Sequence, residues 1–257
     1  MKKILFLLLL TAMVGVAHGQ TKQAQIDELM KAAQNLRDKN NEAASIPKYD
    51  AVLKLDPGHY EALHSISLMY SRVGNRFGNE DQAKKAEFFN KAKSYAEKAM
   101  QANPTDAEGQ FVMAVAMGRM ALIADAKGRV AASKDIKKYA EAAIRYNPNH
   151  AGAWDVLGRW NIKVANLNFA EKAAANLLFG GVPEGASNEN AIRCFNNALT
   201  YKPNYILYLY DLATAYYQVK NTTKAKEFLN KVISQAPVTE DDPGIQKEAK
   251  MMLQTIK

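Results

Sequence analysis

Small and apolar residues recur along the chain at helical spacing, and the recurrence is aligned on a set of prolines. These prolines are Pro57, Pro104, Pro148, Pro203 and Pro237. The residues 12, 8 and 5 positions before each proline are mostly small or apolar, as in Ala191, Phe195 and Ala198 before Pro203. Spacings of four and three place each trio on one stripe of a helix. The pattern therefore predicts a helix that ends just before each of these prolines.

A second helix is predicted after the prolines. Trp154, Leu157 and Gly158 lie 6, 9 and 10 positions after Pro148, and Leu209, Leu212 and Ala213 lie at the same offsets after Pro203. From Pro203 to Pro237 the chain advances 34 residues. A period of about 34 residues with two helices per unit is typical of the tetratricopeptide repeat.

The unit resembles that family. Trp154-x-x-Leu157-Gly158, Ala191-x-x-x-Phe195 and Pro203 match its W-x-x-L-G, A-x-x-x-F and P signatures. The resemblance implies an all-α, right-handed superhelix of antiparallel helix pairs, formed by residues 20–257 as a single domain. The expected repeats cover about 26–59, 60–106, 107–150, 151–205 and 206–239.

Three of the repeats are longer than 34 residues and must carry insertions. Residues 71–81, with Gly74 and Gly78, predict a longer loop. Residues 121–133 predict longer helices with a break near Gly128. Residues 166–190 predict an inserted helix over 169–179, capped by Asn168 and ended by Gly180-Gly181.

A last helix over 243–256 is predicted from Asp242 as its N-cap and Pro243 at its first position. Its apolar stripe would cover the open end of the stack, as helical repeat arrays require. That stripe comprises Ile245, Ala249, Met252, Leu253 and Ile256.

The N-terminus predicts export. Lys2 and Lys3 precede an apolar run, and small residues lead to Gly19 and Gln20. This order is typical of a secretory signal peptide over residues 1–19, cleaved near Gly19-Gln20. An uncleaved membrane anchor is the alternative. No later stretch reaches the ~18 apolar residues of a membrane span, so we expect a soluble periplasmic or extracellular protein.

Composition narrows the function further. The formal net charge is +8, which allows an acidic partner, although an ordinary solvated helix face is the simpler explanation. No Lys/Arg-rich run is interleaved with aromatic residues, so no nucleic-acid partner is expected. Cys194 is the one cysteine, so no internal disulfide is possible and helix packing must hold the fold.

Catalytic and metal-binding motifs are missing from the sequence. It contains no phosphate-binding loop, zinc-protease, nucleophile-elbow or C-x-x-C motif. His59 and His150 fall in turns of different repeats, and the acidic run Glu240-Asp241-Asp242 fits a helix N-terminus better than a calcium site. We therefore expect no enzyme activity, no cofactor and no metal.

From Pro148 onward a narrower resemblance appears. Leu157-Gly158-x-Trp160, the segment ending Leu178-Phe179-Gly180, and Ala191 to Phe195 resemble the regulator of microtubule dynamics family. The resemblance covers residues 149–253 well and implies a tetratricopeptide-like protein that acts through contacts. The family's eukaryotic members are tied to organelle membranes and the cytoskeleton. An exported chain cannot meet microtubules, so the resemblance is used for the fold and not for that role.

The remaining candidate is a binding surface. In tetratricopeptide proteins, positions 2, 5, 9 and 12 of the repeat usually face the concave groove. The resemblance thus selects Arg37, His64, Asp155, Arg159, Tyr210 and Tyr217.

The leading hypothesis is a non-catalytic protein- or peptide-binding scaffold of the cell envelope. One alternative is a small-ligand binder or enzyme, with a pocket closed against Trp160 by residues 166–190 and lined by paired carboxylates. The other is a self-associating structural protein.

Overall fold

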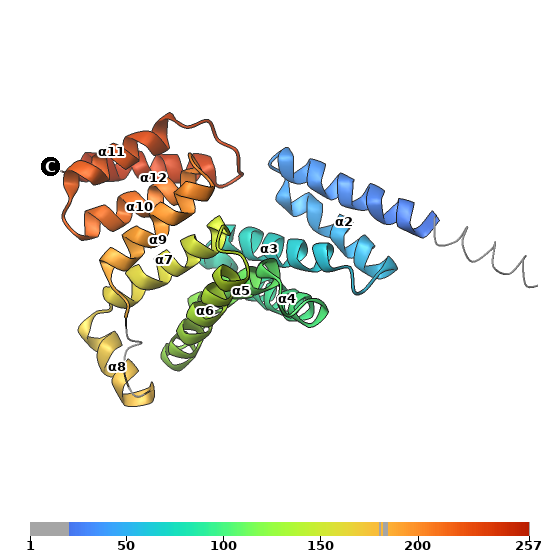
Figure 1. Ribbon diagram of the computed structural model, residues 1–257, viewed down its shortest axis with the longest axis horizontal. Helices are drawn as coiled ribbons and strands as arrows, with labels where there is room; N and C mark the ends of the chain where they lie inside the picture. The colour runs from blue at the N-terminus through green and yellow to red at the C-terminus, as the bar shows by residue number, and fades with distance from the viewer. Residues whose placement is uncertain (1–20, 180, 182–184, 257) are drawn as a thin grey trace, which may run out of the picture.

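Helices make up the fold. The computed structural model describes residues 21–179, 181 and 185–256, and within these ranges it contains helices, turns and no strand (Figure 1). The prediction of an all-α, tetratricopeptide-like superhelix is therefore confirmed. The expected signal peptide lies outside the described residues.

The helices follow one another as antiparallel pairs. The first helix, residues 21–38, packs with α2 (Glu42–Leu55). The next pairs are α3 (Tyr60–Arg76) with α4 (Gln82–Ala102), α5 (Ala107–Ile123) with α6 (Ala126–Tyr146), α7 (Ala151–Ala165) with α9 (Asn188–Tyr201), and α10 (Ile206–Gln218) with α11 (Thr222–Ser234). Helix α8 (Phe169–Phe179) is inserted between α7 and α9, and α12 (Asp242–Thr255) packs on α10 and α11.

The prolines that define the pattern all lie at corners between helices. At four of these corners the helix closes with a backbone N–H that donates to the carbonyl four residues back, as Asn147 does to Ala143. At three of these four corners, a side chain then caps the following helix. His59 Nδ1 accepts from Ala62 N at 3.3 Å, and His150 Nδ1 accepts from Ala153 N at 3.0 Å. The two histidines expected in turns thus act as N-caps of α3 and α7.

The predicted apolar stripes form the interior. Tyr49, Val52, Phe195 and Leu229 are each at most 1% exposed. One cluster joins the helices from the first to α5, a second joins α9 and α10, and a third joins α10, α11 and α12. Neighbouring pairs therefore share a core from the first helix to α5 and again from α9 to α12, as in other helical repeat proteins.

The expected loop over residues 71–81 was a wrong prediction. Helix α3 continues through Gly74 to Arg76, and the connection to α4 is only residues 77–81, which include the short 3-10 turn η1 (Asn79–Asp81). A β-carbon at Gly74 would lie 2.8 Å from Phe88 Cβ. Gly74 therefore serves the close crossing of α3 and α4, and not a turn.

The other two insertions match their predictions more closely. The break between α5 and α6 falls at Ala124 and Asp125, and Asp125 accepts a hydrogen bond from Gly128 N in the first turn of α6. The inserted helix α8 has the expected bounds and cap. Asn168 Oδ1 accepts from Glu171 N, and Glu171 Oε2 accepts from Asn168 N, both at 2.9 Å.

The C-terminal helix has the predicted apolar stripe, but its start differs by one residue. Asp241 stands at the N-cap position without a side-chain cap bond, and Asp242 is the first helical residue. The buried Asp242 carboxylate accepts the N–H groups of Val238 and Thr239 at 2.8 and 2.7 Å. It therefore holds the preceding loop in place.

The array curls, so that α10, α11 and α12 turn back toward the first helices (Figure 1). The loop before α12 approaches the start of α2, and Glu42 N donates to Glu240 Oε2 at 3.2 Å across 198 residues of sequence. Of the helices described, none is both long and apolar enough to cross a membrane.

Candidate functional site

Two of the predicted concave-face residues meet in one ion-pair group. Arg159 in α7 forms a bidentate pair with Asp211 in α10. Its Nε donates to Oδ2 at 2.6 Å and its Nη2 donates to Oδ1 at 3.2 Å. Asp155 Oδ2, one helical turn earlier, lies 3.5 Å from Arg159 Nε. The group therefore ties the first helices of two consecutive pairs together.

The two carboxylates of this group share one cation. Asp155 is only 4% exposed, whereas the Arg159 side chain is 43% exposed. Burial, reinforced by the negative charge of Asp211, raises the pKa of Asp155 well above its ordinary value. Arg159 is thus already neutralised by the protein's own acids and is poorly placed to be the main anchor for a ligand.

Arg119 in α5 is in the opposite situation. Its Nη1 donates to Asn75 Oδ1 at 2.9 Å, and its buried Nε has no hydrogen-bond partner. Burial and then the positive charge of Arg159 lower the pKa of Arg119 to about 10. The guanidinium therefore lies in a position where an additional anion would be stabilised.

A second uncompensated cation is Lys202, which follows α9. Its Nζ lies 4.0 Å from the ring centre of Tyr205. Water reaches the side chain, but surrounding protein leaves its ammonium partly desolvated. This desolvation, followed by the charges of Arg72 and Arg37, lowers the pKa of Lys202. Arg37 in the first helix, Arg119 in α5 and Lys202 after α9 thus contribute to one field of positive potential.

The other predicted residues are spread along the array. Arg37 Nη1 donates to Tyr49 Oη at 3.3 Å. The ring of His64 packs edge-on against the ring of Tyr60, with 5.1 Å between the ring centres. Burial lowers the pKa of His64. Tyr210 lies near α12, where burial and Glu248 raise its pKa to about 12, and Tyr217 is 40% exposed. In the described part of the chain, Asp155 and Arg159 are the one pair of the six in direct polar contact.

Several charged residues escaped the sequence analysis. Arg72 and Arg76 lie in the segment expected to be a loop, and both pair with Glu42 and Asp241. Their spacing of four residues, on one face of a helix, was the signal that could have found them. Arg119 offered no such local signal, because its environment is created by α3 and α7.

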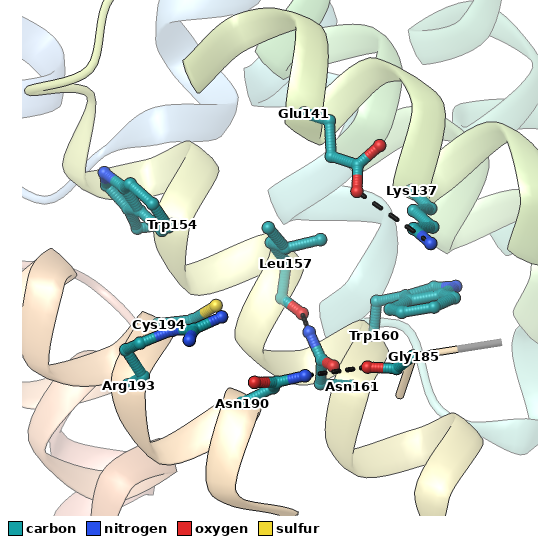
Figure 2. Close-up of a pocket in the computed structure, with 10 residues that line it drawn as sticks. All are labelled: Lys137, Glu141, Trp154, Leu157, Trp160, Asn161, Gly185, Asn190, Arg193 and Cys194. Carbon is teal, nitrogen blue, oxygen red and sulfur yellow. Dashed lines mark hydrogen bonds and ion pairs between the residues drawn. The ribbon is translucent and has the colours of Figure 1, made fainter. Parts of the chain in front are cut away.

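A pocket lies on α6, α7 and α9 beside the inserted segment (Figure 2). It encloses about 130 Å³, with Trp154 and Trp160 at two of its sides. Both indole N–H groups donate to backbone carbonyls, of Pro148 at 2.8 Å and Ser133 at 2.9 Å. Asn190 Nδ2 donates to Gly185 O at 2.7 Å, and both residues line the pocket.

The enzymatic hypothesis required paired carboxylates in this pocket. Glu141 is the one carboxylate among the described residues that line it. Cys194, also in the lining, is buried, and burial raises the pKa of its thiol to about 11. A thiol with that pKa stays protonated near neutral pH and is a poor nucleophile. Elsewhere in the described ranges, no group of three or more potential ligands is arranged to hold a metal ion.

Comparisons with known proteins agree with this architecture. Regulator of microtubule dynamics protein 1 of Bos taurus is 26% identical over 239 residues, covering 93% of this chain and 74% of that protein. Protein 2 of Mus musculus is 24% identical, and the match covers 92% of this chain and 57% of that protein. A thermophilic TPR protein of Thermus thermophilus superposes with a TM-score of 0.64 at 17% identity, over 88% of this chain and 99% of the other.

The structural likeness shows the fold alone, but the family model extends over most of the sequence. It describes Regulator of microtubule dynamics protein 1-3 and matches residues 23–257, from the first described helix to the end of α12 and beyond. That range includes every helix pair, the inserted helix and the pocket. The chain belongs to the Regulator of microtubule dynamics protein 1-3 family.

Proposed function

We propose that this protein is a non-catalytic scaffold that binds an acidic segment of another protein on the concave face of its superhelix. The tetratricopeptide-like fold supports protein binding, because stacked helix pairs create an extended inner surface. The positive charges of Arg37, Arg119 and Lys202 support the acidic character of the partner.

The observation that carries the proposal is the state of Arg119. A guanidinium with a buried, unpartnered Nε costs free energy that a bound carboxylate would recover. By contrast, Arg159 already holds two aspartates. We therefore assign Arg119 as the principal anchor and Lys202 as a supporting contact.

Binding of a labelled peptide tests this assignment. The probe is a short fluorescent peptide rich in Asp and Glu, and its Asn/Gln counterpart serves as the neutral reference. We expect the acidic peptide to bind more tightly, and Arg119→Gln to weaken it by about tenfold or more, since a charged hydrogen bond is worth about 1.5–3 kcal/mol. Lys202→Met is expected to have a smaller effect in the same direction.

Lys250→Met supplies the matched control, because Lys250 is an exposed cation on α12. The substitution removes one positive charge, as Arg119→Gln does, and leaves Arg37, Arg119 and Lys202 unchanged. Equal affinity of Arg119→Gln and Lys250→Met for the acidic peptide would contradict the proposed site. Equal affinity of the wild type for the acidic and neutral peptides would contradict the acidic partner.

We further propose that the protein acts in the cell envelope, since residues 1–19 have the order of a signal peptide. The relatives are named for microtubule dynamics, and an exported chain would share their fold while binding a different partner. Fractionation of the producing cells with an antibody against the described domain tests this. Recovery in the cytosol with residues 1–19 intact would contradict it.

A further inference from the structure

The two ends of the array meet through side chains far apart in the sequence. Arg72 and Arg76, one turn apart on α3, both reach the loop that precedes α12. Arg72 Nη2 lies 3.2 Å from Asp241 Oδ2, and Arg76 Nε donates to Asp241 Oδ1 at 2.6 Å. Arg76 Nη1 lies 2.9 Å from Glu240 Oε2.

Glu42 completes this group from α2. Its carboxylate lies 3.0 Å from Arg72 Nη1 and also pairs with Arg76. Its backbone N–H, at the start of α2, donates to Glu240 Oε2. A helix start leaves such N–H groups without partners inside the helix, so a carboxylate is favoured there. We call these five residues, Glu42, Arg72, Arg76, Glu240 and Asp241, the clasp.

Apolar packing does not reinforce this contact. In the described part of the chain, α11 and α12 pack against each other and against α10, and neither packs on α2 or α3. The apolar cluster of the first helices and that of the last helices contain different residues. The described contacts between this loop and the helices α2 and α3 are therefore ion pairs and hydrogen bonds.

The ion pairs of the clasp are partly exposed to solvent, so they can break and re-form. The side chains of Glu240 and Asp241 are each 35% exposed, and those of Arg72 and Arg76 are 18% and 24% exposed. Ion pairs with such exposure are weakened by salt and by competing ions. Glu42, whose side chain is 6% exposed, still pairs with both arginines when the acidic loop leaves, so opening leaves the charge of one arginine to be balanced by solvent or by a bound anion.

We propose that the clasp closes the superhelix reversibly, with the acidic loop acting as an internal ligand of Arg72 and Arg76 that controls access to the concave face. Closure itself follows from the geometry of the five residues. The control of access rests on the proposed function. Because the clasp and the peptide anchor Arg119 are different residues, their failures are distinguishable.

A distance measurement tests closure without any ligand. Cys194 is replaced by Ala, and spin labels are attached at Lys54→Cys in α2 and Lys250→Cys in α12, both exposed positions. We expect a narrow distance distribution at low salt. It is expected to broaden and lengthen at about 1 M salt, where the screening length is about 3 Å.

Charge removal gives the second arm. The double variant Glu240→Gln with Asp241→Asn, in an exposed loop, is expected to open the array at low salt with unchanged helix content. Glu87→Gln with Glu227→Gln removes the same charge from ion pairs on α4 and α11 and is the matched control. An unchanged distribution in the clasp variant, or equal broadening in the control, would overturn the proposal.

Access is measured separately with the acidic peptide. The clasp variant is expected to bind the acidic peptide faster than the wild type, because the loop before α12 no longer closes the array. If the distance changes but the association rate does not, closure stands and control of access is refuted. If the peptide does not bind, or binds equally well to Arg119→Gln, the proposed function fails. The distance result remains valid in either case.

Discussion

Gly158 in α7 lies directly against the ring of Phe195 in α9. A β-carbon at position 158 would be 2.5 Å from Phe195 Cε1 and 2.7 Å from Cδ1. Phe195 is 1% exposed and cannot move aside without disturbing the cluster it forms with Leu212 and Ala215. The crossing of α7 and α9 therefore depends on the missing side chain at Gly158.

Gly158→Ala is expected to destabilise the protein by about 1–3 kcal/mol, because the added methyl group overpacks a closed interior. Gly118→Ala is the control, since a β-carbon at Gly118 in α5 meets nothing within 4 Å. It is expected to gain up to about 1 kcal/mol from better helix propensity. Urea denaturation measures both, and equal stability of the two variants would contradict the close crossing.

The Asp155–Arg159–Asp211 group is expected to show asymmetric effects. Arg159→Met leaves the largely buried Asp211 without its two charged hydrogen bonds and is expected to cost about 3 kcal/mol of unfolding free energy. Asp155→Asn keeps the Arg159–Asp211 pair and is expected to cost little at neutral pH. Denaturation of both variants at pH 7 checks this, and a greater loss in Asp155→Asn than in Arg159→Met would be inconsistent with it.

The same group predicts a pH dependence. Burial and Asp211 raise the pKa of Asp155, so the folded protein holds this proton more tightly than the unfolded chain. The wild type is therefore expected to lose stability relative to Asp155→Asn as the pH rises from the ordinary aspartate range through the raised pKa. Parallel unfolding curves between these limits measure the difference, and a difference that grows in the opposite direction would refute the assignment.

Cys194 is expected to react slowly with thiol reagents in the folded protein. Burial raises its pKa to about 11, so little thiolate exists near pH 8. The rate of reaction with a disulfide reagent is expected to rise sharply across the urea unfolding transition. Rapid native-state labelling at the rate of the unfolded control would show that the pocket beside Trp154 admits the reagent to an active thiol.

Helix α8 is expected to open locally. Among the described helices it packs on α6, and Asn168 and Glu171 cap its start. Asn168→Ala is expected to reduce the local stability of α8 by about 1 kcal/mol. Hydrogen exchange is expected to increase in α8 and not in α11. Asn221→Ala, which removes the cap of α11, is the converse control.

The helix pairs could be predicted because their signals are local. Each proline and its preceding stripe lie within one helix and one corner, so the chain pattern alone specifies them. Asn168 and its helix were found for the same reason. The prediction for Gly74 was wrong because its role depends on Phe88 in another helix, and a glycine that serves a turn looks identical in sequence.

The charged sites were largely beyond sequence reasoning. Asp155 and Arg159 follow from the repeat position, but their partner Asp211 comes from the next pair. Glu240 and Asp241 suggested a helix dipole, whereas their contacts are with arginines 164 to 169 residues earlier. Such pairs depend on the curvature of the whole array, which accumulates from small rotations at each corner.

The clasp also has a consequence for how the array melts. A stack of repeats ordinarily unravels from its termini, because a terminal repeat has a neighbour on one side only. The ion pair of Arg76 and Asp241 links the second helix pair to the start of the last helix. The salt concentration is therefore expected to set the cooperativity of thermal unfolding. At low ionic strength the array unfolds in one sharp transition, and in concentrated salt it frays progressively from both ends.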